Sequence, residues 1–289
     1  MPTPSRAVAA ATTILAALVC LLGVSGPATA DPPRVASPRA ARHASHAPRV
    51  FSGRAFDTCN APSLSALRSW RRSSPYGAVG VYVGGRNRAC EQSRLNAGWV
   101  RAAAGIGWRL LPLYVGDQAP CLSRSFGSSR INSRHASASG TSDGHDAVRS
   151  AAGLGIAPGS PIYLDMEAYP RGSGRCTQAV LQYTSAWTHA LHAAGYLSGF
   201  YSSADAGVAD LSAAVQHHSA AIRAGVPDVI WYARWDDRDS TDGRHALHGG
   251  LWQGHRRVHQ FRGNWEERHG GVTIRIDRSA VDAPVAVVR

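Results

Sequence analysis

Short apolar runs alternate with amphipathic stretches from about residue 50 to the end of the chain. Glycine, proline or small polar residues bound most of the runs, which is typical of buried strands. The runs predict strands at 54–57, 78–83, 108–115, 161–167, 197–201, 229–235, 251–253, 257–261 and 272–277. The stretches between them predict helices at 63–72, 95–105, 144–154, 177–194 and 204–217, and a polar loop at 116–140.

This alternation predicts a single α/β domain over residues 51–289, folded as a TIM-like (β/α)8 barrel. The usual length of such a barrel, ~250 residues, fits this span. A doubly wound open sheet is the alternative. However, neither a G-x-G-x-x-G motif nor a Walker A motif follows the first strand. We therefore expect a barrel with no cofactor and no metal.

The stretch at 161–169 joins an apolar strand to two acidic residues, Asp165 and Glu167. Residues i and i+2 of a strand project to the same side, so both carboxyl groups point together from its carboxyl end. Burying two acids is costly unless they are paired or functional. Two carboxyl groups on one side also suit acid/base chemistry at a glycosidic bond. The alternative is a solvated pair, or a cap for the next helix.

Further candidate residues lie at the predicted carboxyl ends of other strands, where barrel enzymes form their sites. Asp57 ends the first strand and Asp277 ends the last, so four carboxyl groups are predicted to converge at one mouth. Aromatic residues near other strand ends are predicted to stack on a sugar: Tyr82, Tyr114, Tyr201, Trp231 and Trp235. For each aromatic residue the alternative is core packing, and for Asp57 or Asp277 alone it is a structural cap.

The first 50 residues differ in composition from the rest of the chain. Residues 1–30 predict a secretory signal peptide, because Arg6 precedes an uncharged apolar stretch that ends in an A-x-A cleavage site at 28–30. A membrane anchor is the alternative, and the helix breakers at 23–27 argue against it. Residues 31–50 predict a disordered linker. We therefore expect a secreted protein that associates with the cell envelope without membrane insertion.

Four cysteines remain after the predicted cleavage: Cys59, Cys90, Cys121 and Cys176. An even number in an exported protein predicts two disulfides. A four-cysteine zinc site would need close C-x-x-C pairs, and none occur. Each cysteine follows one of the first four predicted strands, so all four are expected in loops on the face that carries the acids. Neighbouring loops would pair Cys59 with Cys90 and Cys121 with Cys176.

The chain has a formal net charge of +12, and every positive side chain is arginine. Such a charge favours acidic surfaces such as a bacterial envelope. Nucleic acid is the competing partner, but no basic run with interleaved aromatic residues occurs, and export argues against it. We expect a monomer whose partner is a cell-wall polysaccharide.

Four motifs resemble those of a known family: Phe56-Asp57-Thr58-Cys59-Asn60-Ala61-Pro62, Val81-Tyr82-Val83-Gly84-Gly85, Pro112-Leu113-Tyr114-Val115-Gly116 and Ile162-Tyr163-Leu164-Asp165-Met166-Glu167. They are similar to the glycoside-hydrolase-like domain of secreted actinobacterial proteins, which is similar in turn to the family 25 lysozymes. The resemblance covers about residues 52–283. It implies a TIM-like barrel with functional residues here at Asp57, Asp165, Glu167, Trp231, Trp235 and Asp277. The sequence departs from the lysozyme pattern at 236–256 and in its cysteines.

The lysozymes cleave peptidoglycan between N-acetylmuramic acid and N-acetylglucosamine, so the resemblance implies hydrolysis of a cell-wall glycan by carboxylate acid/base chemistry. Fold does not carry function, so this hypothesis depends on the four acids. A non-catalytic carbohydrate-binding domain on the same barrel is the main alternative. A metal-dependent amidase or deacetylase is a third, because His255 and His259 lie four residues apart. That pair is not on a convincing helix, and no H-E-x-x-H motif is present.

Overall fold

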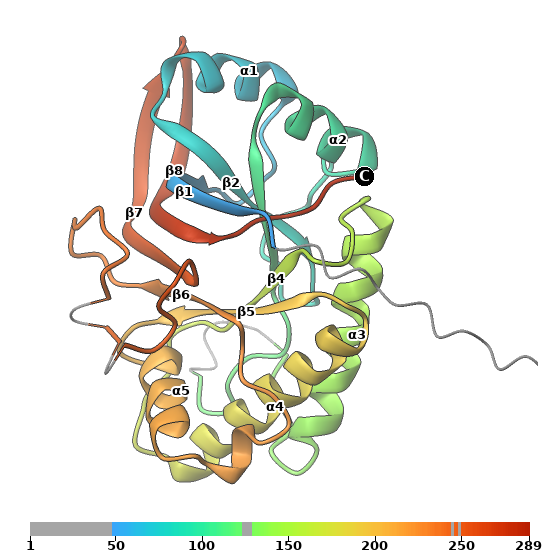
Figure 1. The fold of residues 1–289 in the computed structure, drawn as a ribbon, viewed down its shortest axis with the longest axis vertical. Helices are drawn as coiled ribbons and strands as arrows, with labels where there is room; N and C mark the ends of the chain where they lie inside the picture. The colour runs from blue at the N-terminus through green and yellow to red at the C-terminus, as the bar shows by residue number, and fades with distance from the viewer. Residues whose placement is uncertain (1–47, 123–128, 244–245, 248–249) are drawn as a thin grey trace, which may run out of the picture. The chain divides into compact units, whose positions relative to one another are not determined.

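The computed structural model describes residues 48–122, 129–243, 246–247 and 250–289. Within them, eight strands close into a barrel in sequence order (Figure 1), which confirms the predicted TIM-like fold. The strands are β1 (Val50–Asp57), β2 (Tyr76–Gly84), β3 (Arg109–Tyr114), β4 (Pro161–Asp165), β5 (Leu197–Ser203), β6 (Val229–Ala233), β7 (Arg257–His269) and β8 (Val272–Pro284). The predicted signal peptide and most of the predicted linker lie outside the described residues.

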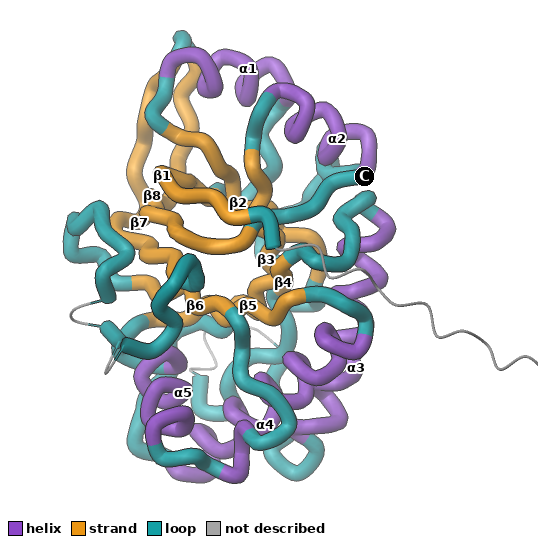
Figure 2. The backbone as a smooth tube through the Cα atoms, in the orientation of Figure 1, coloured by secondary structure: helices purple, strands orange, loops and turns teal. Residues whose placement is uncertain are grey.

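Helices surround the ring of strands, with α1 and α2 on one side and α3, α4 and α5 on the other (Figure 2). Their bounds are α1 (Leu64–Ser73), α2 (Ala97–Ile106), α3 (Ala136–Gly153), α4 (Gly174–Ala193) and α5 (Gly207–Gln216), with a short 3-10 helix η2 (Ala220–Ile222). Side-chain caps fix the starts of α1 and α2, where Ser63 and Asn96 accept backbone hydrogen bonds. Among the described residues, no helix is long and apolar enough to cross a membrane.

Helix α3 starts at Ala136, whereas the sequence predicted a start at residue 144. The early turns contain small residues that lie against α4. A Cβ atom added at Gly140 would lie only 2.2 Å from the carbonyl oxygen of Tyr183. Small residues allow two helices to approach closely, but they give no apolar periodicity, which is why the pattern did not reveal this part of the helix. The predicted loop at 116–140 is correspondingly shorter.

Strand β8 closes the barrel and runs antiparallel to both of its neighbours, β7 and β1, whereas the other neighbouring strands are parallel. The β7–β8 hairpin extends past the barrel to α1, where Trp70 Nε1 donates to the carbonyl oxygen of Val272 (3.0 Å). Two strand predictions were wrong in this region. The last strand continues beyond residue 277, and 251–253 forms a turn in which Trp252 has a positive φ of 51°.

Alternate residues of each strand face two separate apolar cores. Inward-facing side chains, among them Leu111, Tyr163 and Trp231, fill the barrel itself. Outward-facing side chains pack against the helices, as Phe56 does on Trp70, with 5.0 Å between ring centroids. The barrel is therefore packed along its axis, and a binding site has to lie at one of its ends.

Candidate active site

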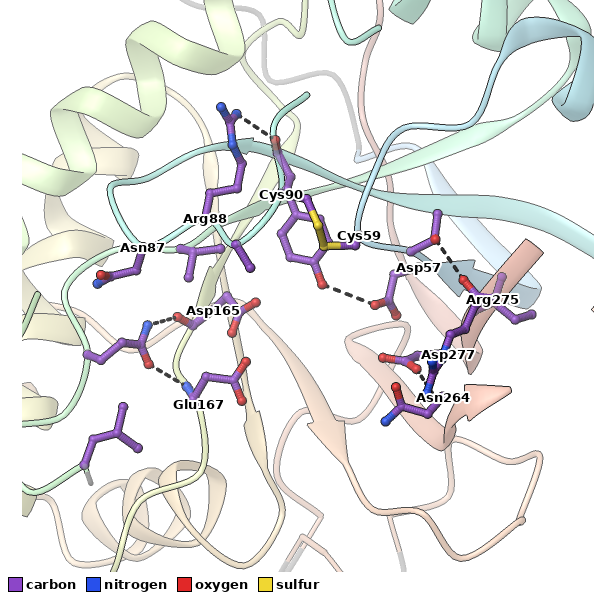
Figure 3. Close-up of a pocket in the computed structure, with 17 residues that line it drawn as sticks. Asp57, Cys59, Asn87, Arg88, Cys90, Asp165, Glu167, Asn264, Arg275 and Asp277 are labelled. Carbon is purple, nitrogen blue, oxygen red and sulfur yellow. Dashed lines mark hydrogen bonds between the residues drawn. A yellow bond between two sulfur atoms is a disulfide. The ribbon is translucent and has the colours of Figure 1, made fainter. Parts of the chain in front are cut away.

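A pocket of about 500 Å³ opens at the end of the barrel where β1 and β4 terminate (Figure 3). All four predicted acidic residues line it: Asp57, Asp165, Glu167 and Asp277. Asp57 and Asp277 come from the adjacent strands β1 and β8, whereas Asp165 and Glu167 come from β4 and the loop after it. Because β4 lies across the barrel from β1 and β8, two pairs of carboxyl groups face each other across one pocket.

Asp57 and Asp277 are directly paired residues of β1 and β8. The sequence predicted Asp277 at the carboxyl end of the last strand, but it lies in the middle of β8. It reaches the pocket because β8 runs antiparallel to β1 and β7. Asp57 is buried and accepts hydrogen bonds from the Tyr82 hydroxyl (3.3 Å) and the Gln260 amide (3.1 Å). Asp277 accepts from the backbone N–H of Asn264 (2.5 Å), which has a positive φ of 57° at an irregularity in β7.

Gln118 holds the backbone of the segment that carries Asp165 and Glu167. Its buried side chain accepts from the N–H of Glu167 (2.8 Å) and donates to the carbonyl oxygen of Asp165 (2.8 Å). The carboxyl group of Asp165 is buried, and its Oδ1 has no hydrogen-bond partner in the described part of the chain. A buried polar atom without a partner is costly and is concentrated at functional positions.

Burial raises the pKa values of all four carboxyl groups, and repulsion from neighbouring acids adds to it for Asp57, Asp165 and Glu167. For Asp57 and Asp165 burial is the largest cause, and neighbouring carboxyl charges add to it, so both pKa values lie well above 3.8. Glu167 is open to solvent, but the pocket walls remove water from around its carboxyl group; this desolvation, with the charge of Asp277, raises its pKa. Burial also raises the pKa of Asp277. A carboxyl group that keeps its proton to higher pH can act as an acid.

Two disulfides fix the loops around the pocket, Cys59–Cys90 and Cys121–Cys176, in the pairing that the sequence predicted. Cys59 and Cys90 line the pocket themselves. Cys121 lies in the loop after β3, whereas Cys176 is in the first turn of α4 and not in a loop as predicted. The second disulfide therefore ties the β3 loop to the helix that follows the acidic segment.

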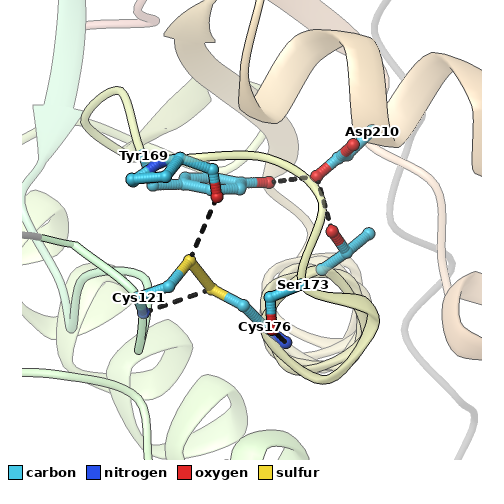
Figure 4. Close-up of a disulfide and its surroundings, with 7 residues drawn as sticks. Cys121, Tyr169, Ser173, Cys176 and Asp210 are labelled. Atoms are coloured by element: carbon cyan, nitrogen blue, oxygen red, sulfur yellow. Dashed lines mark hydrogen bonds between the residues drawn. A yellow bond between two sulfur atoms is a disulfide. The ribbon is translucent and has the colours of Figure 1, made fainter.

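Asp210, on α5, anchors the chain between β4 and α4 (Figure 4). Its carboxylate accepts hydrogen bonds from the hydroxyl groups of Tyr169 (2.9 Å) and Thr177 (2.8 Å). Arg171 Nε also donates to it (2.7 Å). Figure 4 shows Tyr169 and Asp210 next to the Cys121–Cys176 disulfide, so the loop after β4 is held from both sides.

Three of the predicted sugar-binding aromatic residues lie at or near the pocket. Tyr82 lines it. Tyr201 is partly buried, and its hydroxyl donates to Gln260 Oε1 (3.1 Å). Trp235 is 57% exposed, and its Nε1 donates to the same oxygen (3.0 Å). These residues surround Asp57 through shared hydrogen bonds, which supports them as candidates for ligand contact.

Tyr114 and Trp231 lie in the two cores, so neither is placed to bind a sugar, contrary to the prediction. Tyr114 faces outward because Leu113 before it faces the barrel interior, and its ring packs on Trp187 with 5.1 Å between centroids. Trp231 faces inward, is fully buried, and meets Tyr163 edge-on at 5.3 Å. Their positions at strand ends did not distinguish a core ring from an exposed one.

Several polar residues that line or support the pocket were missed in the sequence, namely Asn87, Arg88, Gln118, Gln260, Asn264 and Arg275. Gln260 could have been found, because it is a polar residue in the apolar run 257–261 and lies on the same, inward face as Val258. Arg275 could also have been found, because it lies two residues before Asp277 on the same strand and therefore on the same face. Gln118 and Asn264 act through loop and bulge geometry that no spacing rule reveals.

His255 and His259 are not neighbours in a common site. His255 Nδ1 is hydrogen-bonded to Asp282 (2.7 Å). His259 is buried on β7, where its ring lies between the carbonyl oxygens of Ser240 and Arg234. Among the described residues, no group of three or more potential metal ligands comes together.

An eight-stranded barrel with paired acids at its mouth fits a glycoside hydrolase-like domain. The chain belongs to the family described as Rv2525c-like, glycoside hydrolase-like domain, whose model matches residues 68–281. No curated protein matches it.

The fold is similar to those of several solved structures, among them the following two. One is an uncharacterized B. stearothermophilus protein, with 16% identity and a TM-score of 0.53 over 79% of this chain and 95% of that one. The other is the modular autolysin LytC from Streptococcus pneumoniae, solved in complex with a synthetic peptidoglycan ligand, with 12% identity and a TM-score of 0.50 over 82% of this chain and 47% of that one. At these identities the likeness concerns the fold alone.

Proposed function

We propose that this protein is a secreted hydrolase that cleaves a glycosidic bond in a cell-wall glycan, peptidoglycan or a related polysaccharide. The observation that carries the proposal is the pair of carboxyl groups on each side of one open pocket. Glycoside hydrolysis needs one carboxyl group to protonate the leaving oxygen and a second to act at the reacting carbon. Membership of a glycoside hydrolase-like family supports the same reaction class.

Glu167 is the general acid of this mechanism. It is the most solvent-exposed of the four acids, so a bound sugar can reach it, and its raised pKa keeps it protonated to a higher pH than an ordinary glutamate. Its proton passes to the oxygen of the leaving sugar as the C–O bond breaks. The hydrogen bond from its N–H to Gln118 supports its position.

Asp165 stabilises the positive charge that develops at the reacting carbon, or orients the substrate's N-acetyl group as an internal nucleophile. Repulsion among the buried acids is relieved when that positive charge forms, so the transition state is stabilised more than the ground state. Asp57 and Asp277 position the attacking water or Asp165. Water supplies a hydroxyl group to the carbon, and its proton returns to the carboxyl groups.

Three features support a cell-wall substrate. LytC, whose fold this chain shares, was solved with a peptidoglycan ligand. The net charge of +12 favours an acidic polymer. The predicted signal peptide at 1–30 and the two disulfides are typical of an exported protein.

The test is release of reducing ends from purified peptidoglycan and other envelope polysaccharides by the mature protein with its disulfides intact. Turnover by the wild type that is lost in Glu167→Gln would support the proposal. If neither protein releases reducing ends but both bind the glycan, the protein is a non-catalytic carbohydrate-binding domain on an enzyme-like barrel.

A further inference from the structure

Two arginines line the pocket, Arg88 and Arg275. Arg88 donates from Nη1 to the carbonyl oxygen of Tyr82 (3.3 Å). The guanidinium group of Arg275, in contrast, makes no hydrogen bond or ion pair with any described residue. The pocket wall therefore contains a guanidinium group whose N–H donors have no hydrogen-bond partner among the described residues.

The position of Arg275 is set by the strand that carries it. Arg275 and Asp277 share one face of β8 because they are two residues apart, and both line the pocket. The backbone is fixed there by Thr58, whose hydroxyl donates to the carbonyl oxygen of Arg275 (2.8 Å). Figure 3 places Arg275 beside Asp277 and Asn264. The charge of Arg275 acts on Asp277, yet no ion pair joins the two side chains.

Two other arginines of the β7–β8 hairpin are paired. Arg262 donates to Asp237, and Arg278 donates to Glu267. Both also lie over the ring of Trp265, at 4.5 and 5.6 Å from its centroid. Arg262 and Arg278 therefore have an acidic partner and an aromatic ring each, whereas the guanidinium group of Arg275 has no ion pair or ring contact among the described residues.

We propose that Arg275 binds a free carboxylate of the substrate, so that the glycan processed at this site is an acidic one. This inference rests on the proposed function and names its substrate class. A pocket lined by four carboxyl groups repels an anionic sugar, and an arginine on its wall removes that repulsion at one place. A guanidinium group also presents two parallel N–H donors, which match a carboxylate.

Two kinds of sugar offer such a carboxylate: uronic acids, and muramic acid whose lactyl group is not joined to a peptide. In peptidoglycan with its stem peptides attached, that lactyl carboxyl is an uncharged amide. Cleavage of that amide therefore has to come first if peptidoglycan strands are the substrate. Oligosaccharides of the two kinds distinguish these sources.

The test is binding to Glu167→Gln protein, measured by titration calorimetry. The ligands are peptide-free muramic acid oligosaccharides, hyaluronan oligosaccharides, the methyl esters of both, and neutral chitin oligosaccharides. We expect at least one acid to bind about tenfold or more tightly than its ester. Adding Arg275→Gln removes this preference. Adding Arg268→Gln, an exposed arginine of the same hairpin that does not line the pocket, preserves it.

Equal affinity for each acid and its ester, or a preference that survives Arg275→Gln, would overturn the inference. Circular dichroism checks that the variants fold. If Arg275→Gln does not fold, Arg275→Lys serves in its place, because it keeps the charge, loses the paired donors and should retain only part of the preference. Binding is measured without turnover, so an inactive wild-type protein counts against the proposed function and leaves this test intact.

Discussion

Gln260 holds the buried carboxyl group of Asp57 with one end of its side-chain amide and two aromatic side chains with the other. Nε2 donates to Asp57 Oδ2 (3.1 Å), while Oε1 accepts from the Tyr201 hydroxyl (3.1 Å) and Trp235 Nε1 (3.0 Å). The indole N–H of Trp235 can only donate, so the amide oxygen faces it and the NH2 group faces Asp57. One side chain thus joins an exposed ring to a buried acid.

Replacing Gln260 by leucine removes a hydrogen bond that lowers the pKa of Asp57. We expect the titration of Asp57 to move to higher pH, because the charged form loses a donor. Carbon-13 NMR of labelled aspartate carboxyl groups measures this directly. If Asp57 works as a carboxylate, the acidic limb of kcat/KM moves in the same direction, and kcat falls by roughly tenfold.

The matched control for this variant is Gln253→Leu, which removes a glutamine from an exposed turn outside the pocket. It should leave the Asp57 titration unchanged. An unaltered Asp57 titration in Gln260→Leu would show that the amide does not set the charge state of this acid.

Glu167→Gln should lower turnover by about 10²–10⁴-fold, the usual contribution of a general acid. The same change should not lower the thermal midpoint at pH 7. The folded protein holds Glu167 at a raised pKa, so its ionised form is less favourable in the folded state than in the unfolded chain. Activity and thermal unfolding are measured on the same preparation. Glu91→Gln, an exposed glutamate that does not line the pocket, is the control and should remain active.

The pH dependence of the free energy of unfolding should reveal the raised pKa of Asp165. Its pKa is 3.8 in the unfolded chain and well above that in the folded protein, so the folded state binds more protons between these values. The free energy of unfolding contributed by this group therefore falls as the pH rises from about 4 through the raised pKa.

Asp165→Asn removes this proton binding. Urea unfolding between pH 4 and pH 8 should give a flatter profile for the variant, so that its free energy of unfolding rises relative to that of the wild type as the pH increases. Titrating groups that do not interact with Asp165, including His192 with its raised pKa, cancel in the difference, whereas Asp57 and Glu167 lose a neighbouring charge in the variant and contribute to it. A difference between the two proteins that is constant with pH would contradict the raised pKa.

The sequence predicted the barrel because apolar runs of strand length recur between helical patterns, and burial on both faces of a strand leaves that signature. It could not predict the direction of the last strand. Asp277 reaches the pocket through antiparallel pairing with Asp57, and an apolar run reads the same in either direction. Helix α3 was cut short for a related reason, since Gly140 and its neighbours pack through small size and not through apolar area.

The acids of the site could be predicted because strand parity and strand ends place them, but their supports could not. Gln118 meets Asp165 and Glu167 only after a loop of β3 has folded against β4. Aromatic residues were ambiguous because core and pocket both need them: one residue of register sends Tyr114 to the helices and Leu113 to the barrel. Parity relative to neighbouring inward-facing residues would have excluded Tyr114.

The two disulfides should have similar effects on stability and different effects on the pocket. They join cysteines 31 and 55 residues apart, and loop-closure entropy assigns about 4 kcal/mol to each. Cys59 and Cys90 line the pocket, whereas Cys121–Cys176 ties the β3 loop to α4. We therefore expect both double serine variants to unfold at lower urea concentration. Well below their thermal midpoints, only Cys59→Ser with Cys90→Ser should weaken glycan binding, by several-fold. Equal binding by both variants would mean that the first disulfide stabilises the barrel without shaping the site.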